Sequence, residues 1–326
     1  MVVAAAGVTT GGYMLPRSAP RSVQETLRGR SALVTGGGGF VGSHIVDALA
    51  PETEVTVFDS FVRGDRGRVP DGVATVEADL RDEDALSAAV DGVDVVFHQA
   101  AIVSVAQSVE DPTTTHAVNV DGTLAVLEAA RRADARVVFA SSAAIYGEPT
   151  AVPVDEDHPK EPASPYGLEK LAGDHYCRIY ADLYGLPTVA LRYFNVYGPR
   201  QAGGDYAGAI TAFAEQARAG GPLRVDGDGD QTRDFVNVAD VVQANLLGAT
   251  TDATGEAFNV GTGTATTIRR VAELVRDRLA PDAEVVHGDP RAGDIRESVA
   301  DIEKARERLG YEPTVALDAG LAEFLG

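Results

Sequence analysis

The stretch Ser31-Ala-Leu-Val-Thr-Gly-Gly-Gly-Gly-Phe-Val-Gly42 decides the fold of this 326-residue chain. A short apolar segment (31–35) runs directly into a row of glycines, and apolar residues then recur at helical spacing over 40–50. The glycines at 36, 37, 39 and 42 satisfy both G-x-G-x-x-G and T-G-x-x-G-x-x-G. A strand, a glycine turn and a helix in this order are typical of dinucleotide-binding folds, because a Cβ in the turn would hold a pyrophosphate away from the backbone N–H groups that start the helix.

Short apolar segments and helix-like segments alternate from this stretch as far as residue 192. Strands are expected at 54–58, 93–97, 135–140 and 188–192, and helices at 82–90, 112–132 and 165–184. This alternation predicts an α/β fold, a doubly wound parallel Rossmann sheet whose ligands lie beyond the carboxyl ends of the strands.

The regular pattern does not cover the whole chain. Residues 1–30 show no periodicity and are expected to form a loose N-terminal extension. Residues 31–192 are expected to form the dinucleotide-binding domain, with a later contribution from about 237–262. Residues 193–326, where the rhythm loosens, should mainly form a smaller α/β lobe for the substrate.

Composition excludes several classes of protein. The charge sum, 28 basic minus 49 acidic residues, is −21, and such a surface repels the phosphates of nucleic acids. No apolar run approaches the roughly 20 residues that cross a bilayer, so no membrane partner is expected. The single cysteine, Cys177, permits neither an internal disulfide nor a zinc site of paired thiolates, which favours a reducing, cytoplasmic location.

The chain also uses arginine far more often than lysine, and aspartate more often than glutamate. Only Lys160, Lys170 and Lys304 are lysines among the 28 basic residues, and aspartates outnumber glutamates 29 to 20. Such a surface suits a high-salt cytoplasm, where counterions screen the self-repulsion. A halophilic protein is one interpretation; an acidic protein from a GC-rich genome is the other.

A carboxylate and a tyrosine–lysine pair extend the dinucleotide hypothesis. Asp59 ends the second strand, where it can accept hydrogen bonds from ribose hydroxyls and repel a 2′-phosphate, which favours NAD, although nearby Arg63 keeps NADP open. Tyr166 and Lys170 share one helix face, and Ser142 follows a strand. Lowering a phenol pKa from about 10 to about 7 needs about 4 kcal/mol, which we expect from the nearby ammonium and the positive nicotinamide ring.

Six motifs in this order resemble those of the extended short-chain dehydrogenase/reductases, and most of all the nucleotide-sugar epimerases of the UDP-glucose 4-epimerase type. The resemblance covers residues 31 to about 322. The motifs are the glycine turn, His98-Gln-Ala-Ala101, Ser141-Ser-Ala-Ala-Ile-Tyr-Gly147, Tyr166-Gly-Leu-Glu-Lys170, Leu191-Arg-Tyr-Phe-Asn-Val-Tyr-Gly-Pro199 and Arg233-Asp-Phe-Val236.

The resemblance implies an NAD-dependent inversion at C4 of a nucleotide-diphosphate sugar, UDP-glucose or UDP-galactose, through a 4-keto intermediate that rotates before hydride returns. Tyr166 would be the base on the 4-hydroxyl, Ser142 would share its hydrogen bond, and Lys170 would bind the nicotinamide ribose. The cofactor contacts carried over are Gly36, Gly39, Phe40, Val41, Gly42, Asp59, Ser60, Asp79, Leu80, Gln99, Ala100, Ala101 and Asn119, together with Tyr166 and Lys170.

The substrate side carries over in the same way. Bringing a diphosphate to so acidic a protein requires local arginine, whose planar fork binds phosphate oxygens in pairs. Serine at position 298 would leave room for an N-acetyl group at C2, and Arg296 would be the partner of a uronic acid. The substrate residues are Ser142, Asn195, Leu223 and Val225 (which flank the base), Arg233, Arg291, Asp294 and Ser298.

Other functions remain as alternatives. In the similar 4,6-dehydratases an acidic residue follows the serine, whereas Ala143 and Ala144 stand here, so dehydration lacks an obvious acid. A dehydratase, a UDP-glucuronate decarboxylase or epimerase and a non-catalytic NAD-binding sensor are the competing readings. Asp226-Gly-Asp-Gly-Asp230 lacks the glycine and glutamate of a calcium loop, so no metal is expected. By analogy, helices 112–132 and 165–184 would form a homodimer interface.

Overall fold

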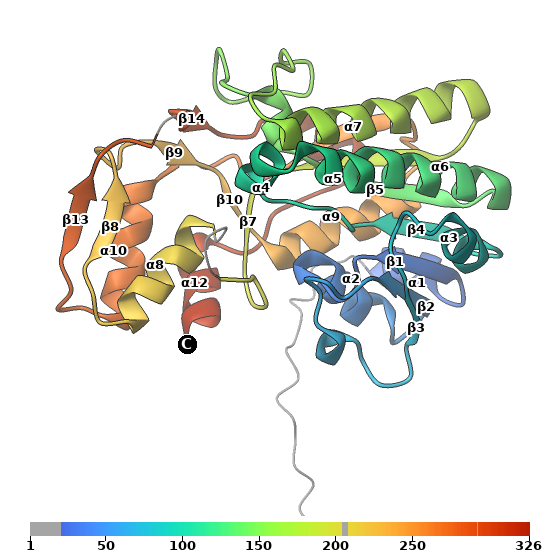
Figure 1. The fold of residues 1–326 in the computed structure, drawn as a ribbon, viewed down its shortest axis with the longest axis horizontal. Coiled ribbons are helices and arrows are strands. Elements are labelled where there is room, and N and C mark those ends of the chain that lie inside the picture. Colours follow the sequence, from blue (N-terminus) through green and yellow to red (C-terminus); the bar gives the residue numbers. More distant parts are fainter. Residues whose placement is uncertain (1–20, 204–207, 292) are drawn as a thin grey trace, which may run out of the picture.

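The computed structural model describes residues 21–203, 208–291 and 293–326, and its centre is a seven-stranded parallel sheet (Figure 1). The strand order is β11-β6-β5-β4-β1-β2-β3, which confirms the doubly wound arrangement. The strands are β1 (Ser31–Thr35), β2 (Glu54–Asp59), β3 (Ala74–Glu77), β4 (Val95–His98), β5 (Arg136–Ser142), β6 (Thr188–Tyr193) and β11 (Glu256–Val260).

Helices cover both faces of this sheet. Successive strand residues face opposite sides, so Leu33 packs into the core on one face and Val34 into the core on the other. The first face is covered by α3 (Glu83–Val90), α6 (Gly122–Ala133) and α7 (Pro165–Tyr184), and the second by α1 (Arg21–Leu27), α2 (Phe40–Leu49) and α9 (Val238–Thr250).

The helix expected at 112–132 is more complex than its periodicity suggests. It consists of α5 (Pro112–His116), a π-helical segment (Ala117–Asp121) and α6. A π segment within an α-helix is often associated with a functional site. Here it contains Asn119, one of the expected cofactor contacts.

The expectation of a loose extension over residues 1–30 is wrong for its last part. Residues 21–27 form α1, whose Val23 and Leu27 are buried in the core beneath α9. Two apolar side chains in so short a helix give a weak periodic signal. Residues 1–20 lie outside the described part of the chain. Strand β3 and α4 (Val105–Glu110) were also not expected from the sequence.

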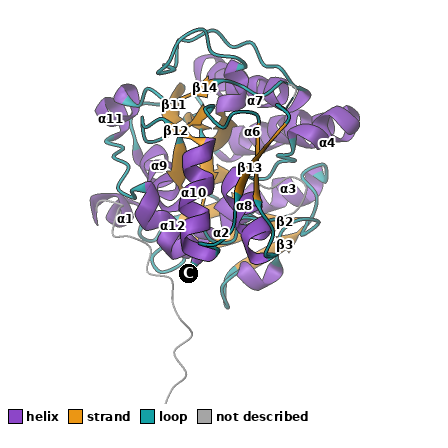
Figure 2. Cartoon of the chain, turned by 90° about the vertical axis from the view of Figure 1, so that its left-hand side faces the viewer, coloured by secondary structure: helices purple, strands orange, loops and turns teal. Residues whose placement is uncertain are grey.

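A third hydrophobic core lies beside the sheet, toward the left of Figure 1 and facing the viewer in Figure 2. It is built from α8 (Ala209–Arg218), α10 (Ile268–Leu279) and α12 (Leu317–Leu325), against β8 (Leu223–Asp226) and β13 (Val285–Gly288). The remaining elements are β7 (Asn195–Tyr197), β9 (Thr232–Arg233), β10 (Phe235–Asn237), β12 (Thr266–Thr267), β14 (Glu297–Ser298), α11 (Glu303–Leu309) and the 3-10 turns Arg66–Arg68 and Ala143–Tyr146. Among the described residues, no helix has the length and apolar character needed to span a membrane.

Candidate active site

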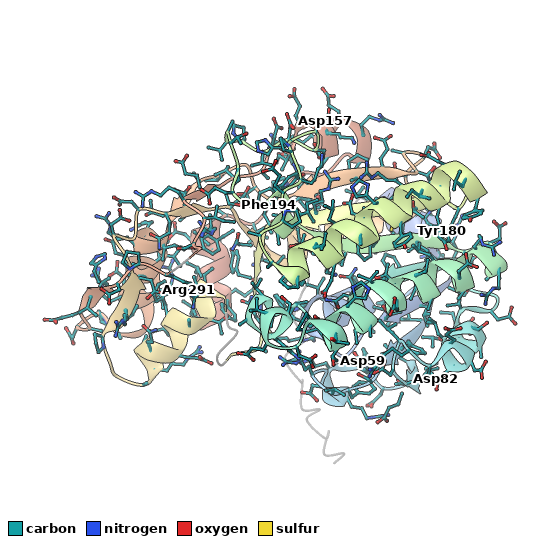
Figure 3. The ribbon with its side chains drawn as sticks, turned by 45° about the horizontal axis from the view of Figure 1, so that its top comes forward. Asp59, Asp82, Asp157, Tyr180, Phe194 and Arg291 are labelled. Carbon is teal, nitrogen blue, oxygen red and sulfur yellow. The ribbon has the colours of Figure 1, made fainter. Side chains whose placement is uncertain are left out.

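Most of the predicted cofactor and catalytic residues lie at one edge of the large sheet. Because its strands are parallel, their carboxyl ends meet at the same edge. Figure 3 marks one of these positions, Asp59 at the end of β2, and Arg291 in the smaller lobe. Gly36 follows β1, Asp79 follows β3, Gln99 follows β4, Ser142 ends β5 and Asn195 follows β6.

The glycine turn closes tightly around its own backbone. Gly36 has φ +70°, and a Cβ built there would lie 2.7 Å from the backbone nitrogen of Ala100. A Cβ on Gly42 would overlap the carbonyl oxygen of Gly36. The N-cap of α2 is Gly39, which provides no side-chain cap. The N–H groups that begin α2 therefore have no competing side-chain acceptor from the cap, as a pyrophosphate site requires.

Asp59 is held rigidly beside this turn. Its side chain is buried, and its two oxygens accept hydrogen bonds from the backbone nitrogens of Gly38 (2.9 Å) and Phe61 (2.8 Å). Carboxylate oxygens have further acceptor capacity, which a ribose diol can use. Arg63, which kept NADP open, donates to Gln107 Oε1 at 2.8 Å. The glycine turn and Asp59 together fit NAD.

Two further expected cofactor contacts are engaged with other protein groups. Gln99 donates to Asn245 Oδ1 at 3.0 Å and accepts from the Tyr193 hydroxyl at 3.2 Å, so α9 and β6 fix its side chain. The Asp79 carboxylate accepts two hydrogen bonds from the guanidinium of Arg81, both at 2.8 Å, and this ion pair lowers the pKa of Asp79.

The candidate acid–base residues come together where β5 meets α7. Tyr166 is half-buried and shares a hydrogen bond with Ser142, while Ser164 caps the first turn of α7. Lys170 is buried, donates to the Ala140 carbonyl at 2.8 Å and lies 5.0 Å from the centre of the Phe139 ring. Strand β5 thus supplies the serine and the carbonyl that orient the two side chains of α7.

The expected lowering of the Tyr166 pKa is not produced by the protein's own groups. Burial raises the pKa of Tyr166, and the hydrogen bond from Ser142 only opposes this effect. Burial also lowers the pKa of Lys170 to about 8, so the ammonium itself is weakly favoured in this apolar place. A positive nicotinamide ring is then the group left to favour the phenolate.

The predicted substrate residues other than Ser142 and Asn195 lie between residues 223 and 298, and the structure brings only some of them together. Arg233 on β9 donates to Asp294 at 2.5 Å and lies beside Ser298, with which it pairs across β9 and β14. Arg291 is 75% exposed, and its guanidinium is 3.9 Å from Asp226. The side chains of Leu223 and Val225 are buried in the lobe's core, which leaves only backbone groups for a base.

The matches to known proteins agree with this geometry. Residues 32–261 match the NAD dependent epimerase/dehydratase family. The chain belongs to this family.

Relatives within the family include named epimerases. A UDP-glucose 4-epimerase of Mycolicibacterium smegmatis is 40% identical over 301 residues, 89% of this chain and 96% of that protein. The structure of a UDP-glucose 4-epimerase from Thermotoga maritima with UDP-glucose has a TM-score of 0.87 and 38% identity, covering 90% of this chain and 97% of that one. A UDP-N-acetylglucosamine 4-epimerase from Methanobrevibacter ruminantium, in complex with UDP-N-acetylmuramic acid, has a TM-score of 0.88 and 36% identity over 91% and 97% of the two chains.

The chain is therefore an NAD-dependent enzyme of the nucleotide-sugar epimerase kind, as its motifs predicted. This chain also contains a buried ion pair, between Arg192 and Asp174, that we did not predict from the sequence. Arg192 of β6 and Asp174 of α7 form two hydrogen bonds of 2.9 and 3.0 Å, and both side chains are almost fully buried. Asp174 also accepts from the hydroxyl of Ser141 at 3.0 Å, and Arg192 donates to that of Tyr146 at 3.0 Å. Arginine within an otherwise apolar strand was the available signal for such a pair.

The aspartates of the turn at residues 226–230, which we compared with a calcium loop, pair with arginines. Asp228 accepts from Arg296 at 2.9 Å, and Asp230 pairs with Arg269. The residues described by the structure contain no cluster of three or more His, Cys, Asp or Glu side chains that could hold a metal ion. Because Arg296 is paired with Asp228, the residue that we expected to bind a uronic acid already has a carboxylate partner in the structure.

His98 and Asn237 have structural roles in the epimerase. His98 is buried, bonds Thr35 (2.8 Å) and Thr123 (3.0 Å) through its two ring nitrogens, and has its pKa lowered to about 3 by burial, which keeps the ring neutral. Asn237 is buried and accepts from the backbone of Ala239 at 2.9 Å as the N-cap of α9.

Proposed function

We propose that this epimerase inverts C4 of a UDP-hexose, interconverting UDP-glucose and UDP-galactose. The observation that carries the proposal is the meeting of Ser142, Tyr166 and Lys170 at the sheet edge that also carries the glycine turn and Asp59. Ala143 and Ala144 follow Ser142 in a 3-10 turn, where a dehydratase of this superfamily would carry an acid.

Each of the three residues has a role that its position supports. The phenolate of Tyr166 takes the proton of the sugar 4-hydroxyl, and Ser142 holds that oxygen in line through its hydroxyl. Lys170 is anchored by the Ala140 carbonyl, from which it would bind the nicotinamide ribose. The positive nicotinamide ring of bound NAD would then favour the phenolate. Bound NAD would supply the acceptor for the C4 hydride and, in the second half-reaction, its donor. Tyr166 returns the proton when the sugar presents its opposite face.

The diphosphate of the substrate would be bound by the arginines Arg233 and Arg291. Arg233 is half-buried, and burial lowers its pKa, while Asp294 provides a countercharge. A diphosphate can replace this partner because phosphate oxygens match the guanidinium fork. We further propose that N-acetylated sugars are accepted, because the residue paired with Arg233 across β9 and β14 is the small Ser298. The related epimerase from M. ruminantium is named for UDP-N-acetylglucosamine.

We propose that the two parts of the chain bind different ligands. Residues 31–192, together with about 237–262, would hold NAD, and the rest of the C-terminal part would hold the nucleotide sugar. We also propose a homodimer through α7 and its neighbours, because α7 exposes the apolar side chains of Leu168, Ile179 and Leu183. A cytoplasmic location suits a chain with one cysteine, and the acidic surface suits high salt.

A panel of UDP-, dTDP- and GDP-sugars, with products identified by NMR, tests the proposed reaction. We expect epimers of UDP-glucose and of UDP-N-acetylglucosamine. Loss of CO₂ from a UDP-uronic acid of the panel would instead establish a decarboxylase, and release of a 4-keto-6-deoxy sugar would establish a dehydratase. Activity on UDP-glucose with none on the acetylated sugar would contradict the role assigned to Ser298.

Replacing the base separates an enzyme from a sensor. Tyr166→Phe should reduce turnover by about 10²–10⁴-fold while NAD remains bound, because only the proton transfer is lost. Tyr184→Phe, on an exposed part of the same helix, is the matched control and should keep full activity. An unchanged rate in Tyr166→Phe would remove this residue from the mechanism.

A further inference from the structure

Glu169 is a buried carboxylate that the proposed reaction does not use. It lies in α7 between Tyr166 and Lys170, and its relative exposure is only 4%. Charged carboxylates are rarely buried so fully without a purpose-built partner, since desolvation disfavours the charge. Its position beside both candidate acid–base residues makes its contacts relevant to the active site.

The partner of Glu169 comes from far along the chain. Glu169 Oε2 accepts from Asn119 Nδ2 at 2.7 Å, across 50 residues of sequence. Asn119 is itself buried, and it makes two bonds to the backbone of Ile102, accepting from the nitrogen at 2.8 Å and donating to the oxygen at 2.9 Å. These bonds connect α7, through the π-helical segment, to the loop that follows β4.

That loop is part of the expected cofactor site. It contains Gln99, Ala100 and Ala101, and Ala100 lies against the glycine turn at Gly36. A hydrogen bond from the loop's next residue, Ile102, therefore fixes the wall of the cofactor site relative to α7. Glu169 is the residue of α7 at which this chain of hydrogen bonds, through Asn119 to Ile102, begins.

The charge of Glu169 acts on the same pair of residues. Glu169 is the neighbour of Lys170 in α7, and both side chains are buried at 4% exposure. The other groups around Lys170 are Cys177 of α7, the Phe139 ring and the Ala140 carbonyl of β5, and His98 of β4. His98 is neutral, Cys177 is a buried thiol with a raised pKa, and the nearby Asp174 is paired with Arg192. Glu169 is thus the negative charge in this set that is not already in an ion pair, and it raises the pKa of both Lys170 and Tyr166.

We infer that Glu169 is a positioning residue of this active site, which fixes the loop after β4 through Asn119 and serves as the fixed countercharge of Lys170. This inference rests on the proposed function, in which Lys170 and Tyr166 work as a pair. Two variants separate the two roles. Glu169→Gln keeps an acceptor for Asn119 and removes the charge, whereas Glu169→Ala removes both.

The first measurement follows the phenolate of Tyr166 by its near-ultraviolet absorbance in the NAD complex, as a function of pH. Each protein is compared with the same protein carrying Tyr166→Phe, so that the other tyrosines cancel. Without the neighbouring negative charge, phenolate forms more easily, so Glu169→Gln should shift the midpoint to lower pH by about one unit. Asp182→Asn, at an exposed position of α7, is the control and should show no shift. A midpoint in Glu169→Gln equal to that of the parent protein would overturn the countercharge role.

The second measurement is NAD affinity by calorimetry. Glu169→Ala should bind NAD about 10-fold more weakly than Glu169→Gln, because the Asn119 bond is lost only in the alanine variant. Equal affinities would overturn the positioning role. Neither measurement needs a sugar, so a pH shift in a protein that converts none of the sugars would reject the proposed reaction and leave the role of Glu169 standing. With the correct sugar, the whole pH–rate profile of Glu169→Gln should move to lower pH, whereas a purely structural role would only lower its height.

Discussion

At the scale of single residues, Asp59 is the carboxylate that we propose selects NAD over NADP. Its two oxygens are oriented by the backbone nitrogens of Gly38 and Phe61, so the side chain is preorganised before any ribose binds. Preorganisation of this kind reduces the entropic cost of binding. A 2′-phosphate brought to the same position would meet the negative charge of a buried carboxylate.

Replacing this carboxylate should weaken the preference between the cofactors. Asp59→Asn is expected to lower NAD affinity by about 10–100-fold, the effect of losing a hydrogen bond to a charged group, and to raise the relative affinity for NADP. Isothermal titration with both cofactors measures the ratio, with Asp71→Asn, an exposed position in a turn, as control. A ratio that does not change would show that another residue excludes the 2′-phosphate.

At the scale of elements, the buried pair Asp174–Arg192 joins the helix that carries Tyr166 and Lys170 to the sheet. Asp174 lies one helical turn beyond Lys170 and bonds Ser141, the neighbour of Ser142, as well as Arg192. One carboxylate therefore connects α7 to β5 and to β6. We therefore expect the position of Tyr166 relative to Ser142 to depend on this connection.

Breaking the pair from one side should therefore be costly. Asp174→Asn leaves the buried guanidinium without its countercharge and should reduce the free energy of unfolding by about 3–5 kcal/mol, as measured by urea denaturation. The double variant Asp174→Leu/Arg192→Met removes both charges and should recover much of this loss, because apolar replacements of buried pairs are often tolerated. A loss below about 1 kcal/mol in the single variant would contradict the structural importance of the pair.

At the scale of the whole molecule, the excess of acidic residues is the dominant feature. The net charge is −21, and many of the aspartates lie on the exposed surface. Self-repulsion of that surface opposes the compact state unless ions screen it.

Stability should therefore depend on salt. Transfer from molar KCl to low salt is expected to lower the thermal midpoint by about 5 °C or more, followed by circular dichroism. An uncharged osmolyte at equal osmolality is the control, since it does not screen charge. An unchanged midpoint in low salt would identify an acidic protein that does not require salt.

Several features follow from the sequence because they are local. The glycine turn between a strand and a helix, the carboxylate that ends β2 and the four-residue spacing of Tyr166 and Lys170 are all read from neighbouring residues. The alternation of strands and helices likewise predicts a parallel, doubly wound sheet. Only the tertiary structure decides which distant groups meet and which lose their water. It pairs Asp174 with Arg192 and Glu169 with Asn119, folds residues 21–27 as a helix and turns the guanidinium of Arg291 toward Asp226. It also raises the pKa of Tyr166, contrary to the expectation from its neighbour Lys170, because desolvation depends on everything packed around the ring and not on spacing along the chain.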